Sequence, residues 1–242
     1  MKKLIFGILL LPLFVSCNDN DSNSDKNWVD IATVENPTQS SAFYFLLDNG
    51  SRMWASTSNL SSYHPKDGQR IIANYSILSN STNSSYNYQV KLNDVYEVLT
   101  KNIFSIKPQQ QDSIGNDQIG IKSIWVGSNY LNIEFVYPGY NKTHFINLIS
   151  DNTKTYSDNK IHLEFRHNAN GDTPVNSGWG VVSFNLQSLQ TGATTDSVNL
   201  VIHTREYTTP IDKSYSLTYK FKKSASTTKK INLPATRTNR IN

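Results

Sequence analysis

Histidine and carboxylate side chains in the second half of the chain have the types and spacing that could support metal chemistry. Four of the five histidines fall there, with two glutamates nearby: His144, His162, His167 and His203, and Glu164 and Glu206. Imidazole nitrogens and carboxylate oxygens are common zinc ligands. Residues two apart share a face of a strand, so His162 and His167 diverge if one regular strand carries both. Pairing between strands can still bring His144 or His203 beside His162.

The sequence lacks the motifs of established catalytic centres. The histidines do not show the short helical spacing of zinc hydrolases, and an outward Glu164 and Arg166 are equally explained by ion pairs between strands. Gly-x-Ser-x-Gly, which exposes a nucleophilic serine, is absent, as is a glycine-rich phosphate loop. We therefore expect no catalytic residues, no metal, no cofactor and no enzymatic activity. A metal- or carboxylate-dependent hydrolase is the alternative from another class.

Cys17, the only cysteine, has the clearest chemical setting. Two lysines precede an unbroken apolar run of twelve residues, 4–15, and the small Ser16 stands directly before Cys17. This run suits a secretory leader and is shorter than the roughly 20 residues of a membrane-spanning helix. We predict that residues 1–16 are a signal peptide and that Cys17 becomes the lipid-modified first residue, which excludes disulfide and thiol chemistry. The alternative is a buried helix that ends in a core cysteine.

Residues 17–27 are predicted to form a flexible acidic tether. The stretch 18–25 contains Asp19, Asp21 and Asp25 and no apolar residue, so it cannot offset the entropy of ordering. Acyl chains on Cys17 anchor a protein without a membrane-spanning helix. We therefore expect lipid anchoring in the cell outer membrane. Short acidic segments of this kind resemble the surface-export signals of Bacteroidetes-type lipoproteins, although a solubilising spacer explains them equally well.

The positive charge of the chain is concentrated at its C-terminus. Removal of the leader leaves 21 basic and 19 acidic side chains, and residues 222–242 contain six of the basic ones and no acid. Residues 17–221 are therefore mildly acidic, with 15 basic against 19 acidic groups. Basic tails of this composition are usually solvated, and we predict that residues 222–242 are disordered. This distribution argues against a nucleic-acid partner.

Short runs rich in tyrosine, phenylalanine and β-branched residues predict an all-β protein. Residues 28–107 contain runs that fit a small closed barrel, with a strong hairpin signal at Asn49-Gly50: 28–34, 42–47, 52–54, 69–78, 86–92 and 95–99. The polar segment 108–120 is the predicted linker. Residues 121–221 then contain seven runs separated by turn residues, which predict a β-sandwich: 121–126, 130–137, 142–149, 161–167, 179–186, 197–203 and 215–221.

Seven segments together give the chain its resemblance to a known family: Trp28–Val34, Pro65–Arg70, Leu92–Tyr96, Asp112–Asp117, Trp125–Gly127, Tyr130–Ile133 and His162–Asn168. On these residues the chain resembles the NigD-like lipoprotein family, from the leader to about Phe221. The resemblance implies an N-terminal OB-type barrel followed by a C-terminal β-sandwich. It also implies an association with bacteriocin gene clusters and immunity, without an established biochemical activity.

OB folds bind oligonucleotides or oligosaccharides on one face of the barrel, often by stacking on aromatic side chains. The aromatic residues of the predicted barrel are therefore candidates for ligand binding. The candidate ligand-binding residues are Trp54, Tyr63, Tyr75, Tyr86 and Tyr88. Lys66, Arg70 and Lys91 could add positive charge, although nearby acids balance them. Packing of these aromatics inside the barrel is the favoured interpretation, and ligand binding is the alternative.

Two serines lie in a pattern that resembles the O-glycosylation acceptor of exported Bacteroidetes proteins. They are Ser113, in Asp112-Ser113-Ile114, and Ser197, in Asp196-Ser197-Val198. The pattern is short enough to arise by chance. The sequence therefore predicts a lipid-anchored, non-enzymatic envelope protein that binds a protein or glycan partner, with a bacteriocin-immunity role as the alternative.

Overall fold

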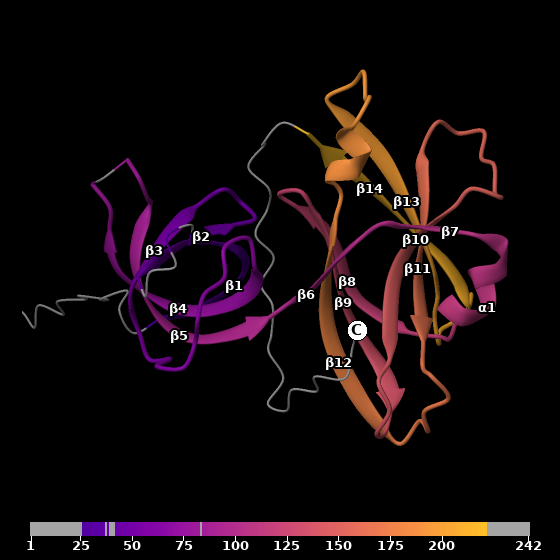
Figure 1. Ribbon diagram of the computed structural model, residues 1–242, viewed down its shortest axis with the longest axis horizontal. Helices are drawn as coiled ribbons and strands as arrows, with labels where there is room; N and C mark the ends of the chain where they lie inside the picture. The colour runs from indigo at the N-terminus through magenta and orange to yellow at the C-terminus, as the bar shows by residue number, and fades with distance from the viewer. Residues whose placement is uncertain (1–25, 37, 39–41, 83, 222–242) are drawn as a thin grey trace, which may run out of the picture.

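The computed structural model describes residues 26–36, 38, 42–82 and 84–221. Figure 1 shows a barrel and a sandwich joined by strand β6 (Leu99–Asn102). The predicted leader, Cys17, most of the tether and the basic tail lie outside the described residues. The described elements are strands apart from α1 (Gln111–Ile114) and two short 3-10 helices. The predicted all-β fold, a small OB-type barrel followed by a β-sandwich, is confirmed.

Five strands form the closed barrel, in the order β1-β2-β3-β5-β4. Their bounds are β1 Asn27–Glu35, β2 Phe43–Leu47, β3 Arg52–Ser58, β4 Arg70–Asn80 and β5 Tyr88–Glu97. Neighbouring strands are antiparallel except β3 and β5, which are parallel. Closure of the sheet leaves no unpaired edge in this half of the protein.

Alternation of apolar and polar residues determines which side chains enter the barrel. On β2, Phe43, Phe45 and Leu47 are buried, whereas the residues between them are partly exposed. Burial of one such side chain stabilises the fold by roughly 1.5–3 kcal/mol. The predicted turn after β2 is present, because Gly50 donates its N–H to the Leu47 carbonyl at 2.9 Å and has a φ of +90° that favours glycine.

Two sheets form the sandwich around one apolar core. The first has the order β14-β13-β11-β10-β7 and the second β6-β12-β9-β8. The bounds are β7 Phe104–Ile106, β8 Gly120–Gly127, β9 Tyr130–Gly139, β10 Phe145–Asp151, β11 Ile161–Asn168, β12 Asn176–Asn185, β13 Ser197–Arg205 and β14 Asp212–Lys220. All seven strand runs expected after residue 120 therefore form strands.

The barrel was expected to extend to residue 107, but its last strand, β5, ends at Glu97. Strands β6 and β7 pair in parallel with β12 and β10, so they belong to the sandwich sheets. Their partners lie far along the sequence, and strands this short show no pattern of their own. The expected linker 108–120 also packs on the sandwich, because it contains α1 and ends at Ile119, which is fully buried in the core.

The barrel and the sandwich share an apolar cluster. Its buried members are Ile31, Ile72, Tyr96 and Val98 from the barrel side and Trp125, Trp179 and Val181 from the sandwich. The Tyr96 and Trp179 rings meet edge to face, with centroids 5.8 Å apart. This arrangement is favourable for aromatic pairs.

A buried ion pair lies beside this cluster and contacts both halves. Arg70 is 1% exposed and donates to both carboxylate oxygens of Asp48, at 2.7 and 2.9 Å. Across the interface Arg70 donates to Asn132 Oδ1 at 3.0 Å, and the Asn132 amide donates to Asp48 at 3.0 Å. A Cβ atom on Gly127 would lie 2.2 Å from Asp48 Oδ2, so glycine is required for this close approach. The two halves are therefore held together by hydrogen-bonded charge as well as by apolar packing.

Candidate functional site

Three aromatic side chains form a platform on the outer face of the barrel. The Trp54 and Tyr86 ring centroids are 5.3 Å apart, and the Tyr44 and Tyr86 centroids are 6.1 Å apart. Tyr44 lies on β2, Trp54 on β3 and Tyr86 in the loop between β4 and β5, and all three are partly exposed. Alternation explains this placement, because the neighbours of Trp54, Met53 and Ala55, enter the core.

Arg52 holds the aromatic platform in place. Its side chain donates to the Ser85 carbonyl at 2.6 Å, and its backbone N–H donates to Asn87 Oδ1 at 2.7 Å. These bonds fix the loop residues on both sides of Tyr86. The guanidinium lies 4.0 Å from the centroid of the Tyr44 ring and forms an ion pair with Glu35 at 2.5 Å. The positive charge beside the platform is therefore balanced.

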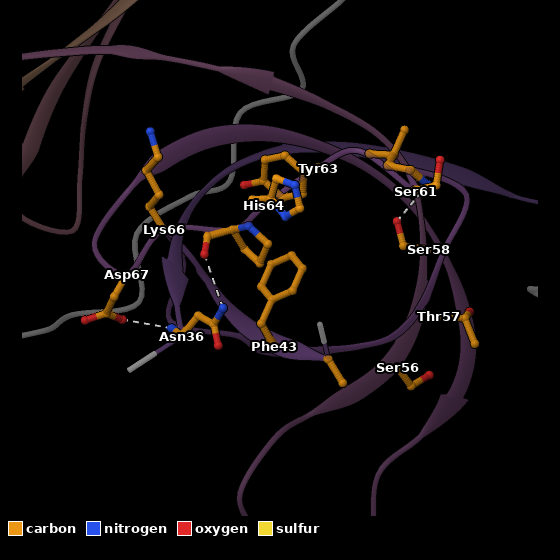
Figure 2. A pocket seen from close by; sticks show the side chains of 13 residues that line it. Asn36, Phe43, Ser56, Thr57, Ser58, Ser61, Tyr63, His64, Lys66 and Asp67 are labelled. Atoms are coloured by element: carbon orange, nitrogen blue, oxygen red, sulfur yellow. Dashed lines mark hydrogen bonds between the residues drawn. The ribbon is translucent and has the colours of Figure 1, made fainter. Parts of the chain in front are cut away.

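A cavity of about 1080 Å³ opens at the end of the barrel next to this face. Figure 2 shows its lining, in which Phe43 and Tyr63 form an aromatic wall with ring centroids 6.0 Å apart. Ser56 belongs to the lining and also accepts a hydrogen bond from Gln89 at 2.9 Å. Ser56 lies at an irregularity of β3, where the pairing with β5 shifts register between Ala55 and Thr57.

The loop between β3 and β4, which lines the cavity, is fixed by hydrogen bonds at its base. Asn36 donates its backbone N–H to Asp67 Oδ1 at 2.8 Å and its side-chain amide to the Pro65 carbonyl at 3.2 Å. Tyr63 donates to Gln69 Oε1 at 3.2 Å. Burial, with Glu97 as a second cause, raises the pKa of Tyr63, so its hydroxyl stays neutral. The cavity thus offers a neutral aromatic surface and polar groups.

The structure separates the five predicted aromatic residues into three environments. Trp54 and Tyr86 belong to the platform, and Tyr63 lines the cavity. Tyr75 was wrong as a ligand-binding candidate, because it is 2% exposed in the barrel core and donates to Asp30 at 2.8 Å. Tyr88 packs against the same core from the inner side of β5. Tyr75 and Tyr88 point inward from β4 and β5, whereas Tyr63 and Tyr86 lie in loops outside the strands.

The residues expected from the sequence did not include Tyr44 of the platform or Arg52, which holds the platform in place. Tyr44 follows Phe43 and Arg52 precedes Met53. Both could have been found once Phe43 and Met53 were assigned to the core, because residues next to a buried one on a strand point outward. Of the expected positive charges, Lys66 lines the cavity. Arg70 was wrong as a ligand-binding charge, because it is buried between the two halves.

The sandwich histidines form two pairs. On β11, His162 and Leu163 point to opposite faces as expected, and pairing with β13 brings His203 beside His162, with 2.8 Å between Nδ1 and Nε2. His144 pairs with His167 instead, also at 2.8 Å. Within residues 26–221, the positions described include no group of three or more histidine, cysteine or acidic side chains that could hold a metal ion.

The His144–His167 pair requires an extra proton to complete its hydrogen bonds. His144 Nε2 faces Asp172 Oδ2 at 3.1 Å, and His167 Nδ1 faces the Gln118 carbonyl at 3.0 Å. Both end groups only accept, so three hydrogen bonds need three ring protons, one more than two neutral imidazoles carry. Burial lowers the pKa of His167 to about 4, which favours the neutral form of this ring.

Glu164 and Arg166 share the outer face of β11, as expected, but are buried rather than solvated. Arg166 Nε donates to Glu164 Oε2 at 2.7 Å, and Lys154 Nζ donates to Glu164 Oε1 at 2.5 Å. Asp151 accepts a hydrogen bond from Gln111 of α1 at 2.9 Å. The expectation of ion pairs between strands was wrong for these residues, because Glu164 pairs with Arg166 of the same strand and with Lys154 of the loop after β10.

The two predicted glycosylation serines differ in accessibility. Ser113 is exposed in α1 and donates its hydroxyl to the Gln110 carbonyl at 3.0 Å. Ser197 is half-buried at the start of β13, opposite Lys220. The predicted lipid site, Cys17, lies outside the described residues, and none of the helices described has the length and apolar character needed to cross a membrane.

Comparisons with known proteins agree with this architecture. Residues 31–98 match the NigD-like N-terminal OB domain, and residues 102–219 match the NigD-like C-terminal beta sandwich domain. A toxin-related protein from Parabacteroides distasonis is 35% identical, with a TM-score of 0.69, and the match covers 82% of this chain and 96% of that chain.

Two further structures have the same fold. A protein of unknown function from Bacteroides vulgatus is 29% identical, with a TM-score of 0.72 and coverage of 86% of this chain and 96% of that chain. A NigD-like immunity protein from Bacteroides caccae is 18% identical, with a TM-score of 0.62 and coverage of 79% and 90%. No curated protein matches the chain. The two family matches together span most of the sequence, and the chain belongs to the NigD-like family.

Proposed function

We propose that this protein is a lipid-anchored envelope protein whose barrel binds a protein or glycan partner on the platform formed by Tyr44, Trp54 and Tyr86. The observation that carries the proposal is the position of these rings. They occupy the outer face of β2 and β3 and the loop between β4 and β5. OB folds use this face and this loop to bind oligonucleotides and oligosaccharides.

Charge and preorganisation favour a neutral ligand over a nucleic acid. Arg52 is paired with Glu35, so the platform presents no excess of positive charge from this residue. Nucleic-acid sites instead depend on unpaired cations that neutralise phosphates. Because Arg52 also fixes the loop that carries Tyr86, little ordering is needed when a partner binds. The barrel site supplies contact surface and no nucleophile–base pair.

Binding is tested with the unlipidated full chain, on a glycan array and against fractionated envelope proteins. Trp54→Ala and Tyr86→Ala are expected to weaken binding at least tenfold, because truncation of an aromatic hot spot at the centre of an interface costs about 2 kcal/mol or more. Trp28→Ala is the matched control, since Trp28 is 44% exposed on β1 of the same barrel. Equal loss in all three variants would show that the platform is not the binding site.

Lipid anchoring rests on the leader and on Cys17, and it has its own test. Cys17→Ser is expected to abolish metabolic labelling with a fatty acid and to release the protein from the membrane fraction. Retention of the lipid in the variant would refute the assignment. Protease treatment of intact cells separates display at the outer surface, where the protein is lost, from a periplasmic location, where it is protected.

An immunity-type role is the second candidate, and its support is the fold shared with the NigD-like immunity protein from Bacteroides caccae. Such a protein would bind a toxin rather than a nutrient or structural glycan. Deletion of the gene should make the strain sensitive to the toxin encoded beside it. Unchanged sensitivity would remove this candidate and leave the platform proposal intact.

A further inference from the structure

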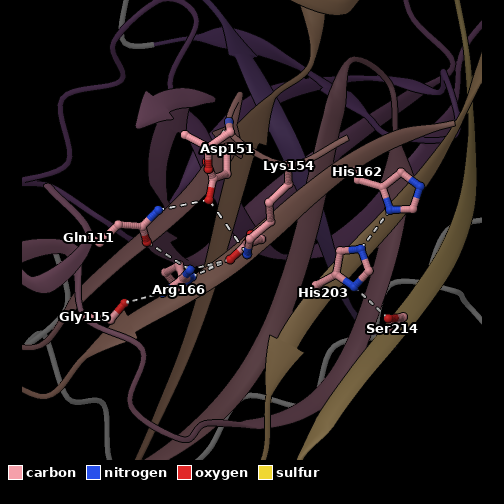
Figure 3. A network of polar contacts seen from close by, with 10 residues as sticks. Gln111, Gly115, Asp151, Lys154, His162, Arg166, His203 and Ser214 are labelled. Atoms are coloured by element: carbon pink, nitrogen blue, oxygen red, sulfur yellow. Dashed lines mark hydrogen bonds and ion pairs between the residues drawn. The ribbon is translucent and has the colours of Figure 1, made fainter. Parts of the chain in front are cut away.

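Four polar side chains on the sandwich form a continuous relay from a carboxylate to a hydroxyl. Asp158 Oδ1 lies 2.9 Å from His162 Nε2, His162 Nδ1 lies 2.8 Å from His203 Nε2, and His203 Nδ1 lies 2.8 Å from Ser214 Oγ. Figure 3 shows His162, His203 and Ser214 in a row on neighbouring strands. The register explains the row, because Ser214 on β14 is directly opposite His203 on β13.

The protons of this relay can be assigned from its end groups. The hydrogen bond from His162 lowers the pKa of Asp158 to about 2, so the carboxylate is ionised and only accepts. His162 then donates from Nε2 and accepts at Nδ1 from His203, whose own Nδ1 accepts from Ser214. Two neutral imidazoles and one hydroxyl supply all three protons. Burial is the largest cause that lowers the pKa of His203, which keeps this ring neutral.

This order is that of an activated nucleophile. A hydroxyl donates to a neutral imidazole, and a further group orients that imidazole through its other nitrogen. Ser214 is exposed, so its oxygen is accessible. Tyr156 stacks on His162 with ring centroids 3.5 Å apart, which restrains the orienting ring.

The Ser214 hydroxyl lines a small polar cavity whose lining includes basic side chains. Its volume is about 310 Å³, and its lining includes Ser214, His203, Lys154, Arg166 and Arg205. Lys154, Arg166 and Lys213 of this lining form ion pairs with carboxylates, so among the described residues Arg205 is the basic side chain of the lining that is left to meet an anionic group. The hydrogen bond to Glu164 raises the pKa of Lys154, so this ammonium remains charged. Fixed cations beside a nucleophile can stabilise the negative charge that develops on a carbonyl oxygen.

We propose that Ser214 is a nucleophile, that His203 is its general base, and that this site hydrolyses small esters that carry an anionic group. Ser214 Oγ forms a bond to the ester carbonyl carbon while its proton passes to His203 Nδ1. Collapse of the tetrahedral adduct breaks the bond to the alcohol oxygen, which takes the proton from His203. Water then attacks the acyl-serine with His203 as base, which releases the carboxylic acid and restores Ser214.

This activity goes beyond the proposed binding function and departs from the expectation of a chain without catalysis. No Gly-x-Ser-x-Gly motif is involved, because strand pairing rather than a turn places the serine beside its base. His203 and Ser214 are eleven residues apart on two strands, so no local motif marks the pair.

The test uses the full chain with p-nitrophenyl acetate and its anionic analogue, mono-p-nitrophenyl succinate. Ser214→Ala and His203→Ala are expected to lower kcat/KM by about 10²–10⁴. Ser216→Ala is the matched control, because Ser216 is also exposed on β14 but lies opposite Val201. The succinate ester should react faster than the acetate in the wild type. Equal rates in the wild type and Ser214→Ala, including rates no higher than in buffer, would overturn the proposal.

A second measurement tests activation at this position without an ester. Ser214→Cys should be alkylated by iodoacetamide about tenfold faster than Ser216→Cys, because a neighbouring imidazole favours the thiolate. Peptide mass spectrometry separates these sites from Cys17. His162 is a positioning residue, and His162→Ala should shift the midpoint of the pH–rate profile, because the His203 ring loses the hydrogen-bond acceptor that His162 Nδ1 provides. Equal alkylation rates, or an unchanged midpoint, would count against the relay.

Discussion

Removal of the Asp48 carboxylate is expected to destabilise the protein strongly. Asp48 accepts two hydrogen bonds from Arg70, at 2.7 and 2.9 Å, and one from Asn132 at 3.0 Å. In Asp48→Ala the guanidinium of Arg70, which is 1% exposed, has no counter-charge inside the interface. Breaking a buried pair from one side costs about 3–5 kcal/mol. For a chain of this size, that loss lowers Tm by roughly 6–20 °C.

Urea unfolding measures this loss, followed by both tryptophan fluorescence and circular dichroism. Glu35→Ala is the matched control, because it removes a carboxylate from an arginine pair whose side chains are 36% and 34% exposed. A surface pair of this kind contributes about 0–1 kcal/mol. The reasoning is refuted if Asp48→Ala costs no more than Glu35→Ala. In that case the interface pair would not hold the two halves together.

Three further predictions follow from the same structure. Gly127→Ala should cost about 1–3 kcal/mol in urea unfolding, because its Cβ atom would lie 2.2 Å from Asp48 Oδ2, and a wild-type midpoint would contradict this. The free energy of unfolding should fall by about 3 kcal/mol as the pH drops from about 6.5 to about 4, because His167 gains a proton near pH 6.5 in the unfolded chain and only near pH 4 in the folded protein. His167→Asn should reduce this dependence of stability on pH. An unchanged pH dependence in the variant would exclude His167 as its source. Glycosylation at Ser113 should add mass to the mature protein, with less modification at the half-buried Ser197, and an unmodified intact mass would exclude both sites.

Strand positions were predictable from the sequence, whereas the environment of single side chains often was not. The barrel and sandwich runs show alternation that survives in the structure, as in Phe43–Leu47. Where both faces of a strand contain aromatic residues, alternation alone does not say which set faces the core. Tyr75 and Trp54 therefore looked equivalent in the sequence, although the first is buried and the second lies on the outer face.

Contacts between distant segments account for the remaining differences between the expected and the observed environments of single residues. Arg70 resembles a surface charge until its partners, Asp48 and Asn132, are placed around it by the barrel and the sandwich. The pairing of His162 with His203 was anticipated as one of two possibilities, because adjacent strands can bring such residues together. Ser214 could not be recognised, since its relation to His203 depends on the register of β13 and β14.

The most direct test of the central claim is the ratio of two dissociation constants for the partner found on the glycan array or among the envelope proteins. The account predicts that Trp54→Ala raises Kd at least tenfold relative to Trp28→Ala, which corresponds to about 1.4 kcal/mol. Both tryptophans lie on the same barrel, so the loss of a tryptophan side chain from the barrel surface is common to the two variants. A ratio near one would contradict the assignment of the β2–β3 face as the binding site.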